Sequence, residues 1–408
     1  MRTEALHERA GDYLRRLCLE IPNRGVGRPG NRAATDFYAA TAESFGFKTE
    51  SPPFDCIDWS QEGASLSVNG APYDALVSPF SLSCSAHARL VVVSTIEQLE
   101  VVDGHGQILL VRGELATEQL MPKNFPFYNP DEHRRIFVLL EEAQPAAVIA
   151  ATGRNPQMAG AIYPFPLIED GDFDIPSAYM TEEEGDRLAK QSGERAVLEI
   201  RSRRIPAVGC NVIARKGSGS GRRVVLFAHI DAKDGTPGAL DNASGVVVLL
   251  LLAELLADYA GALEIELVAM NGEDYYACPG EIQWLASNSR RLDDIVLGIN
   301  IDGAGFQTGR TAYSLYGCPA QIERVVRRVL SSSEGIVAGE PWYQSDHSIF
   351  IQNGVPALAV TSEQIFEILT EIAHTDADLP EMVDPARLVE VAYALREVVL
   401  ELDRLWDK

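Results

Sequence analysis

The sequence predicts an α/β protein with a mostly parallel central sheet, helices on both faces of that sheet, and an inserted β-rich α+β domain. From residue 208 onward, short apolar runs alternate with helix-like segments, which is typical of a largely parallel sheet. Polar residues follow several of these runs, where ligand sites of open α/β sheets usually lie. Between residues 55 and 203 short strand patterns dominate instead, which indicates a separate domain.

Length and composition set the domain organisation. The chain has 408 residues, of which 46% are apolar and 23% are charged, as in soluble globular proteins. Because 408 residues exceed one ordinary hydrophobic core, we expect two domains. The main domain is predicted to combine residues 1–54 and 204–408, and the inserted domain to cover residues 55–203.

The charge and the apolar runs exclude several classes of partner. A net charge of −24 argues against nucleic acid and against anionic membrane surfaces, which attract clustered Lys and Arg. The most apolar run, residues 246–256, is too short to span a bilayer, and the amino terminus shows no secretory signal pattern. Six scattered cysteines indicate free thiols. We therefore expect no membrane or nucleic-acid partner and a cytoplasmic location.

The first segment is predicted to be helical. Residues 3–19 form an amphipathic helix pattern, and residues 21–31 follow as a loop rich in Pro, Gly and Arg, I-P-N-R-G-V-G-R-P-G-N. Asn31 is placed to cap a second helix that continues to about Phe45 and ends at Gly46. Residues 48–54 then read as a strand.

The inserted segment is predicted to be strand-rich and without a catalytic cluster. Strand patterns cover residues 64–68, 89–94, 107–111, 146–151 and 197–201, and helices fit residues 131–144 and 181–191. The second helix begins with Thr181 and Glu184 in capping-box spacing. The histidines of this region are isolated, which favours surface or structural roles for His87, His105 and His133.

Strand and helix patterns alternate through the rest of the chain. Strands are expected at residues 211–214, 224–228, 263–270, 296–301, 311–316 and 355–360. Helices are expected at residues 243–259, 280–287, 319–332 and 384–403, with a short one at 349–351.

Five polar clusters lie at the ends of these predicted strands or in loops after them. Imidazoles and carboxylates without thiolates suit a hydrolytic site for Zn, Co or Mn. Two His and three carboxylates are too many for one tetrahedral zinc with an open position, but they fit two ions that share a carboxylate, about 3.5–4 Å apart. The clusters are His229 with Asp231, Asp241 with Asn242, Glu273 with Asp274, Asp302, and His374.

Each cluster also has a structural interpretation when it is taken alone. Asp241 or Asn242 could cap a helix, the Asp-Gly pair at Asp302 could form a turn, and the acidic loop around His374 could simply be solvated. Caps and turns do not readily place all five clusters at one edge of a sheet, so their joint occurrence favours the metal site.

These stretches carry a resemblance to a known family. The motifs A-H-I-D, G-A-L-D-N-A-S-G, N-G-E-D, N-I-D-G-A-G, S-D-H-S-I-F and A-H-T-D-A-D resemble those of the zinc-dependent exopeptidases. That family includes bacterial leucyl aminopeptidases, glutamate carboxypeptidase and glutaminyl cyclase. The resemblance covers residues 208–403, and residues 3–54 match the segment that usually precedes them. The inserted region resembles, more loosely, a protease-associated domain.

The resemblance implies a role for each ligand-type residue. Asp241 would bridge two divalent metal ions, for which zinc is favoured and Co or Mn remain alternatives. His229 and Asp302 would complete one ion, and Asp274 and His374 the other.

The resemblance also implies catalytic and supporting roles. Glu273 would be the general base, and Asp231 would orient His229 or tune the charge of the metal. The peptide bond between Asp241 and Asn242 is expected to be cis. The family usually has a second Glu where this chain has Asp274, a shorter residue that can still bind a metal.

Several residues near the motifs have open roles. Tyr275 and Tyr276 either shape a substrate pocket or pack, and Tyr343 is a candidate to polarise the substrate carbonyl. Asp346 and His347 are interpreted as a structural hydrogen-bonding pair and not as ligands.

The function that these expectations favour is a metal-dependent exopeptidase. An aminopeptidase would hydrolyse short peptides through a water held between two zinc ions. The alternatives are a glutaminyl cyclase-type acyltransferase with a single zinc, and a non-catalytic binding relative. The expected partner is a peptide substrate, and the sequence leaves open the preferred residue, the amino- or carboxypeptidase polarity and a homo-oligomeric state.

Overall fold

The chain divides into two compact units. The computed structural model describes residues 2–21, 23–154, 163–217, 221–343 and 345–406. The first unit comprises Met1–Cys56 and Val208–Lys408, and the second comprises Ile57–Ala207. The sequence placed these divisions at 54/55 and 203/204. Strands β2 (Pro53–Val68) and β9 (Arg195–Cys210) carry the chain from the first unit into the second and back.

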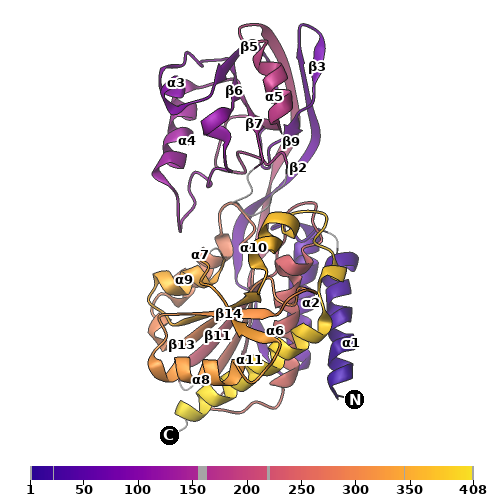
Figure 1. Ribbon diagram of the computed structural model, residues 1–408, viewed down its shortest axis with the longest axis vertical. Coiled ribbons are helices and arrows are strands. Elements are labelled where there is room, and N and C mark those ends of the chain that lie inside the picture. The colour runs from indigo at the N-terminus through magenta and orange to yellow at the C-terminus, as the bar shows by residue number, and fades with distance from the viewer. Residues whose placement is uncertain (1, 22, 155–162, 218–220, 344, 407–408) are drawn as a thin grey trace. The chain divides into compact units, whose positions relative to one another are not determined.

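An eight-stranded sheet forms the centre of the first unit (Figure 1). Its strands are ordered β1-β10-β12-β11-β13-β16-β14-β15. The four central strands β12, β11, β13 and β16 are parallel to one another. The strand bounds are β1 (Lys48–Glu50), β10 (Val212–Lys216), β11 (Arg223–His229), β12 (Glu264–Met270), β13 (Ile295–Ile301), β14 (Thr311–Tyr316), β15 (Ile336–Ala338) and β16 (Ala357–Ser362).

This sheet is mixed, so the expectation of a mostly parallel sheet is confirmed for its centre and not for its edges. On one side β1 pairs with β10, and β10 with β12, in antiparallel fashion. On the other side β14 is antiparallel to β16 and parallel to β15. A parallel connection needs a crossover of a dozen or more residues, usually a helix. Strands β10 and β11 are separated by only six residues, and β13 and β14 by only nine, which is too short for such a crossover. Apolar runs alone do not show strand direction, which is why the pattern did not predict this.

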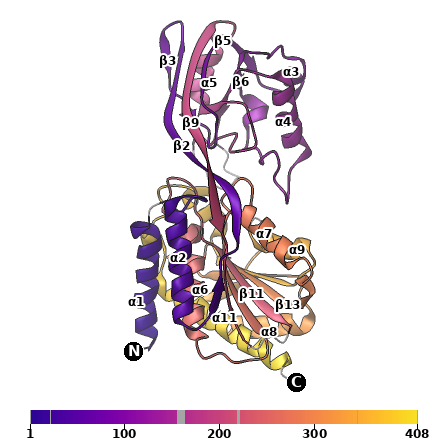
Figure 2. The ribbon, with the colours of Figure 1, turned by 180° about the vertical axis from the view of Figure 1, so that it is seen from behind.

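One face of the sheet is covered by α6 (Ser244–Leu255) and the helices outside it (Figure 2). Helix α6 is buried nearly all round because it lies between the sheet and the outer helices α1 (Arg2–Arg15) and α11 (Pro385–Trp406). Helices α2 (Pro29–Ser44) and α8 (Ala320–Leu330) extend this layer. Within the described residues, no helix has both the length and the apolar character needed to cross a membrane.

The opposite face is covered by α7 (Pro279–Asn288) and α9 (His347–Gln352). An aromatic cluster joins these helices to strand β11. The ring of Phe227 stacks on Phe350 at 4.4 Å and meets Trp284 edge-on at 5.2 Å. A side chain at Gly298 would collide with Phe350, with only 2.4 Å between a Cβ and the ring. Helices on both faces therefore hold the sheet, as the sequence predicted.

A fully buried ion pair lies within this unit. Arg223 and Glu266, on neighbouring strands, are both 0% exposed, with 3.1 Å between Nη1 and Oε2. Glu266 also accepts hydrogen bonds from Arg215 and from the Trp284 indole. A buried charge is tolerated only when it is paired and hydrogen-bonded, so this network stabilises the sheet as long as all its members remain.

Replacing Glu266 by Gln is expected to destabilise the protein by about 3–5 kcal/mol, because Arg223 would keep a buried charge without its partner. Chemical unfolding followed by tryptophan fluorescence, to which the neighbouring Trp284 contributes, measures this loss. The matched control is Glu363→Gln, which removes an exposed pair with Arg310 and should change stability little. Equal unfolding midpoints for Glu266→Gln and wild type would contradict the prediction.

The second unit is built on another eight-stranded sheet, ordered β3-β2-β9-β5-β6-β7-β8-β4. Strands β5 to β8 pair in parallel, whereas β3 with β2, β9 with β5 and β8 with β4 pair in antiparallel fashion. This β-rich α+β arrangement agrees with the expected class, while its likeness to a protease-associated domain stays a prediction. The elements are β3 (Ala71–Tyr73), β4 (Leu76–Val77), β5 (Cys84–Val93), α3 (Ile96–Val101), β6 (Ile108–Val111), α4 (Asp131–Ala143), β7 (Ala147–Thr152), β8 (Ser177–Thr181) and α5 (Glu182–Ala189).

Candidate metal centre

The predicted site residues follow three neighbouring parallel strands. His229 ends β11, Glu273 and Asp274 follow β12, and Asp302 follows β13. Because the carboxyl ends of parallel neighbours meet at one edge of a sheet, these residues gather there. Asp241 joins them from the turn η3 (Ala239–Ala243), which leads into α6.

His374 joins from a turn after the helical segment that ends at Ile372. The Asp241 carboxylate lies between the two imidazoles: Oδ1 is 3.0 Å from His229 Nε2, and Oδ2 is 3.0 Å from His374 Nε2. Asp302 Oδ1 lies 3.7 Å from the first of these nitrogens, and Asp274 Oδ1 lies 2.9 Å from the second. The five predicted ligands thus form two groups that share Asp241.

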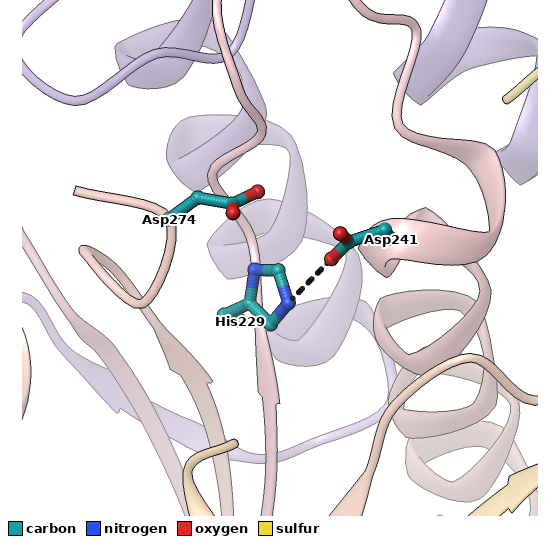
Figure 3. A group of neighbouring side chains, drawn as sticks. All are labelled: His229, Asp241 and Asp274. Carbon is teal, nitrogen blue, oxygen red and sulfur yellow. Dashed lines mark ion pairs between the residues drawn. The ribbon is translucent and has the colours of Figure 1, made fainter. Parts of the chain in front are cut away.

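The donor atoms converge without satisfying one another. His229 is fully buried and Asp274 nearly so, and within the described residues neither ring nitrogen of His229, nor Asp274 Oδ2, has a hydrogen-bond partner. Figure 3 shows His229 beside Asp241, with Asp274 close by. Ligands about 2.0–2.2 Å from a tetrahedral ion lie about 3.3 Å apart, near the observed spacings. Donor set and spacing therefore fit a divalent metal, and His229, Asp241 and Asp274 could hold an ion together.

The charges of the cluster are strongly coupled. Burial would lower the pKa of His229, but its contacts with Asp241 and Asp302 raise that pKa well above its usual value. Burial would raise the pKa of Asp241, but the imidazoles of His229 and His374 hold it far below its usual value. The Asp241 carboxylate is therefore ionised, as a metal ligand must be.

Glu273 differs from the other acids at this edge. Its side chain is 26% exposed, and Oε2 lies 4.0 Å from His229 Nε2. Burial, followed by the charges of Asp274, Asp302 and Asp241, raises its pKa well above the usual value. A carboxyl group with a raised pKa that faces the cluster can take up and release a proton, as general acid–base catalysis requires.

Asp231 supports the loop that carries Glu273 and Asp274. Its Oδ1 accepts a hydrogen bond from Gly272 N at 2.7 Å, and its Oδ2 accepts one from Asp274 N at 3.0 Å. The ring of His229 lies farther off, with 3.8 Å between Nδ1 and Asp231 Oδ1. The carboxylate thus contacts the ligand loop more closely than the imidazole that it was predicted to orient, and its assignment as a catalytic residue stays a prediction.

Asp378 was missed by the sequence reasoning. It is fully buried, and its two oxygens accept hydrogen bonds from Leu240 N at 2.7 Å and Asp241 N at 3.0 Å. It therefore fixes the turn that presents the Asp241 carboxylate. The available signal was its place as the last residue of A-H-T-D-A-D. The Asp241–Asn242 peptide bond is cis, which confirms the expectation drawn from the resemblance.

Ser345 is a second residue that sequence reasoning passed over. Its hydroxyl donates to Asp302 Oδ2 at 2.7 Å and accepts from Asn300 Nδ2 at 2.7 Å. Asn300 also contacts His347, whose Nε2 lies 2.7 Å from the carbonyl of Trp342. This chain of contacts orients the Asp302 carboxylate. Its signal was the first position of S-D-H-S-I-F.

Asp346 and His347 do not form the predicted pair. Within the described residues, both carboxylate oxygens of Asp346 lack a hydrogen-bond donor, as does Glu281 Oε2. Asp346 and Glu281 are each 2% exposed and contact one another. Burial raises the pKa of Asp346 well above its usual value, and burial raises the pKa of Glu281 to about 7. His347 turns instead to Asn300 and Trp342.

This raised pKa predicts that stability depends on pH. Burial raises the pKa of Glu281 to about 7 in the folded protein, whereas the pKa of an unfolded Glu is about 4.3. The protonated Glu281 stabilises the folded state fully below about pH 4.3. This contribution to the free energy of unfolding, about 3–4 kcal/mol in total, is lost as the pH rises through 7. Glu281→Gln should therefore reduce the fall in unfolding free energy of the metal-free protein between pH 5 and pH 8, measured by urea unfolding. The exposed Glu371→Gln is the control, and an unchanged fall in Glu281→Gln would refute the prediction.

The three candidate tyrosines occupy different environments. Tyr275 is buried, and its ring lies 4.6 Å from that of the half-buried Tyr276. Tyr343 is 59% exposed, and its ring lies 5.4 Å from Tyr316. Tyr275 therefore packs inside the unit, while Tyr276 and Tyr343 keep surface available for a substrate.

Comparison with known proteins gives a family match over the region that carries the site. Residues 211–399 match the description Peptidase family M28. A probable leucine aminopeptidase 2 from Aspergillus fumigatus is 27% identical over 320 residues, which is 73% of this chain and 60% of that protein. The chain thus matches less than two thirds of the length of this relative.

Solved structures share the fold along nearly the whole chain. An aminopeptidase from Aneurinibacillus sp. strain AM-1 has a TM-score of 0.74 and 20% identity, covering 96% of this chain and 93% of its own. A zinc aminopeptidase from Bacillus subtilis also has a TM-score of 0.74, with 18% identity over 97% of this chain and 94% of its own. At these identities the likeness shows the fold alone.

Proposed function

We propose that the protein is a metal-dependent aminopeptidase that acts on short peptides, because residues 211–399 match the description Peptidase family M28. The observation that carries the proposal is the Asp241 carboxylate, which lies 3.0 Å from each of two imidazoles. Each imidazole has a further carboxylate beside it. This arrangement supports two divalent ions, for which zinc is favoured because zinc prefers histidine and carboxylate ligands in catalytic sites.

The predicted ligands would form two sets, one for each ion. Asp241 would contribute one oxygen to each ion, His229 and Asp302 would complete one ligand set, and Asp274 and His374 the other. When bound, the ions supply Lewis-acid activation of water and of the scissile carbonyl. Asp378 holds the backbone amide of Asp241, and Ser345 holds the carboxylate of Asp302, through hydrogen bonds.

Glu273 moves the proton in this proposal. Its raised pKa and its position beside the cluster suit a base that accepts a proton from the attacking water at a carboxylate oxygen. The same carboxyl group then donates that proton to the nitrogen of the leaving amine. Acid–base catalysis is most efficient when the pKa lies near the working pH, and the burial of Glu273 moves its pKa in that direction.

The arrangement of the residues argues against both alternatives that the sequence left open, a single-zinc cyclase and a non-catalytic binding relative. A single-zinc cyclase would need only one of the two ligand groups, whereas both are assembled around Asp241. A non-catalytic relative would be expected to have lost ligands, and all five predicted positions converge. A homo-oligomeric state and the cytoplasmic location predicted from the sequence remain proposals, and the sequence leaves the preferred residue open.

One experiment separates these functions. The purified protein is freed of metal, reloaded with Zn²⁺, Co²⁺ or Mn²⁺, and examined for metal content and turnover. Aminoacyl amides, dipeptides, their N-acetylated forms and peptides with amino-terminal glutamine serve as substrates. We expect two ions per chain, hydrolysis that a chelator abolishes, and no cleavage of acetylated substrates. One ion per chain with cyclisation of glutamine would establish the cyclase, and bound metal without turnover on any substrate would favour a binding relative.

A further inference from the structure

We propose that residues 23–31 brace the two loops that carry Asp241 and Glu273–Asp274, and that Arg24 and Asn31 act as positioning residues. This inference rests on the proposed function, because it concerns the placement of the same ligands. The segment is the Pro/Gly/Arg loop of the sequence, N-R-G-V-G-R-P-G-N, to which the mechanism assigns no role.

Arg24 binds the loop that joins the first imidazole to Asp241. Its side chain is 3% exposed, and its guanidinium donates to four backbone carbonyls. Three of these carbonyls, from residues 230, 237 and 238, belong to the ligand loop, at 2.8–3.0 Å. The fourth belongs to Leu17, at 2.8 Å, in the segment that precedes the brace. Arg24 thereby ties both ends of this loop to the amino-terminal segment.

The chemistry of this contact requires arginine. A buried cation is costly unless its donors are satisfied, and here the acceptors are carbonyl oxygens of a loop that has no regular structure of its own. A planar guanidinium can reach carbonyls in several directions at once, whereas a lysine ammonium places its donors on a single nitrogen. The loop also fits closely around the guanidinium, since a Cβ at Gly238 would lie 2.8 Å from Arg24 Nη2.

Asp378 binds the amide groups of the same loop, whereas Arg24 binds its carbonyl groups. Its carboxylate accepts from the amides of Leu240 and Asp241, while Arg24 donates to the carbonyls just before them. The backbone that leads into Asp241 is therefore fixed by a cation at its carbonyls and by an anion at its amides.

Asn31 holds the second ligand loop. Its side-chain amide and that of Asn271 exchange hydrogen bonds in both directions, at 2.8 and 2.9 Å. Both residues are buried, and Asn271 lies two residues before Glu273. Asn31 Nδ2 also donates to the carbonyl of Arg24 at 2.8 Å, so the two contacts of the brace are joined to each other.

The brace therefore sets the distance between ligands that come from different strands. Asp241 and Asp274 must lie close enough to share His374, with which each makes a contact of 2.9–3.0 Å. Strand pairing fixes where the loops begin, and the contacts of Arg24 and Asn31 fix how they continue.

The test compares Arg24→Lys with Arg32→Lys. Arg32 lies one residue beyond the segment, in α2, and it is exposed; its guanidinium lies 3.4 Å from the carbonyl of residue 208. Metal affinity is measured by competition between the protein and a chelator for Zn²⁺. Supporting partners of metal ligands contribute about 10- to 100-fold to affinity, and we expect a loss in this range for Arg24→Lys and none for Arg32→Lys. The absorption spectrum of the Co²⁺-loaded protein should also change only in Arg24→Lys.

Two further measurements separate positioning from general stability. Hydrogen exchange of the metal-free protein should show lost protection in residues 230–241, with that of α6 and α11 retained. Asn31→Ala should weaken Zn²⁺ affinity in the same direction, with lost protection in residues 271–274. A folded Arg24→Lys protein with wild-type Zn²⁺ affinity overturns the inference. Failure of both variants to fold also overturns it, because the segment would then have a general structural role. If the wild-type protein binds no Zn²⁺, it is the proposed function that fails.

Discussion

Glu273→Gln is expected to retain bound metal and to lower kcat by about 100- to 10,000-fold, the contribution typical of a general acid–base group. Glutamine has nearly the same shape as glutamate but cannot accept a proton from water or return one to the leaving amine. Glu273 Oε2 lies 4.0 Å from His229 Nε2, and Glu273 is not assigned as a ligand. The ions should therefore remain bound.

The measurement is the steady-state hydrolysis of an aminoacyl amide, with metal content determined on the same preparation. The exposed Glu371→Gln, three residues before His374, is the matched control and should behave as wild type. Wild-type turnover in a fully metal-loaded Glu273→Gln protein would remove the assigned base. Loss of turnover together with loss of metal would instead identify Glu273 as a ligand.

Asp241→Asn is expected to abolish activity by removing the ions themselves. An amide has one oxygen acceptor and no charge, so it cannot serve both imidazoles as the carboxylate does at 3.0 Å on each side. Loss of supporting partners alone weakens metal binding by about 10- to 100-fold, so loss of the shared ligand should exceed about 100-fold.

Elemental analysis after dialysis against metal-free buffer, together with chelator competition, checks this expectation. Asp376→Asn changes an exposed acid two residues from His374 and should retain full metal content. Two tightly bound ions in Asp241→Asn would show that Asp241 does not bridge them, and the assignment of Asp241 as the shared ligand would have to be abandoned.

The sequence predicted the centre of the fold and the site for one physical reason. Strands β11, β12 and β13 are parallel neighbours, so the residues directly after them must meet at one edge. His229, Asp274 and Asp302 could therefore be grouped from local patterns, without knowledge of the other contacts. The family resemblance then supplied the separate roles of Glu273 and Asp241.

The supporting residues could not be found in this way. Arg24 and Asp378 act on backbone carbonyls and amides of a loop that is distant in sequence, and backbone groups leave no residue pattern to read. The role of Asn31 was also not predicted from the sequence. It was predicted to cap a helix, but α2 begins at Pro29, and the Asn31 side chain instead pairs with Asn271, 240 residues away.

The late position of His374 has a consequence for synthesis. A nascent chain that has emerged only as far as β16 already carries His229, Asp241, Asp274 and Asp302, but it lacks the second imidazole and the Asp378 carboxylate that holds the Asp241 turn. Under the proposed function, a chain that has emerged only as far as β16 would lack part of the metal centre and would not hydrolyse peptides.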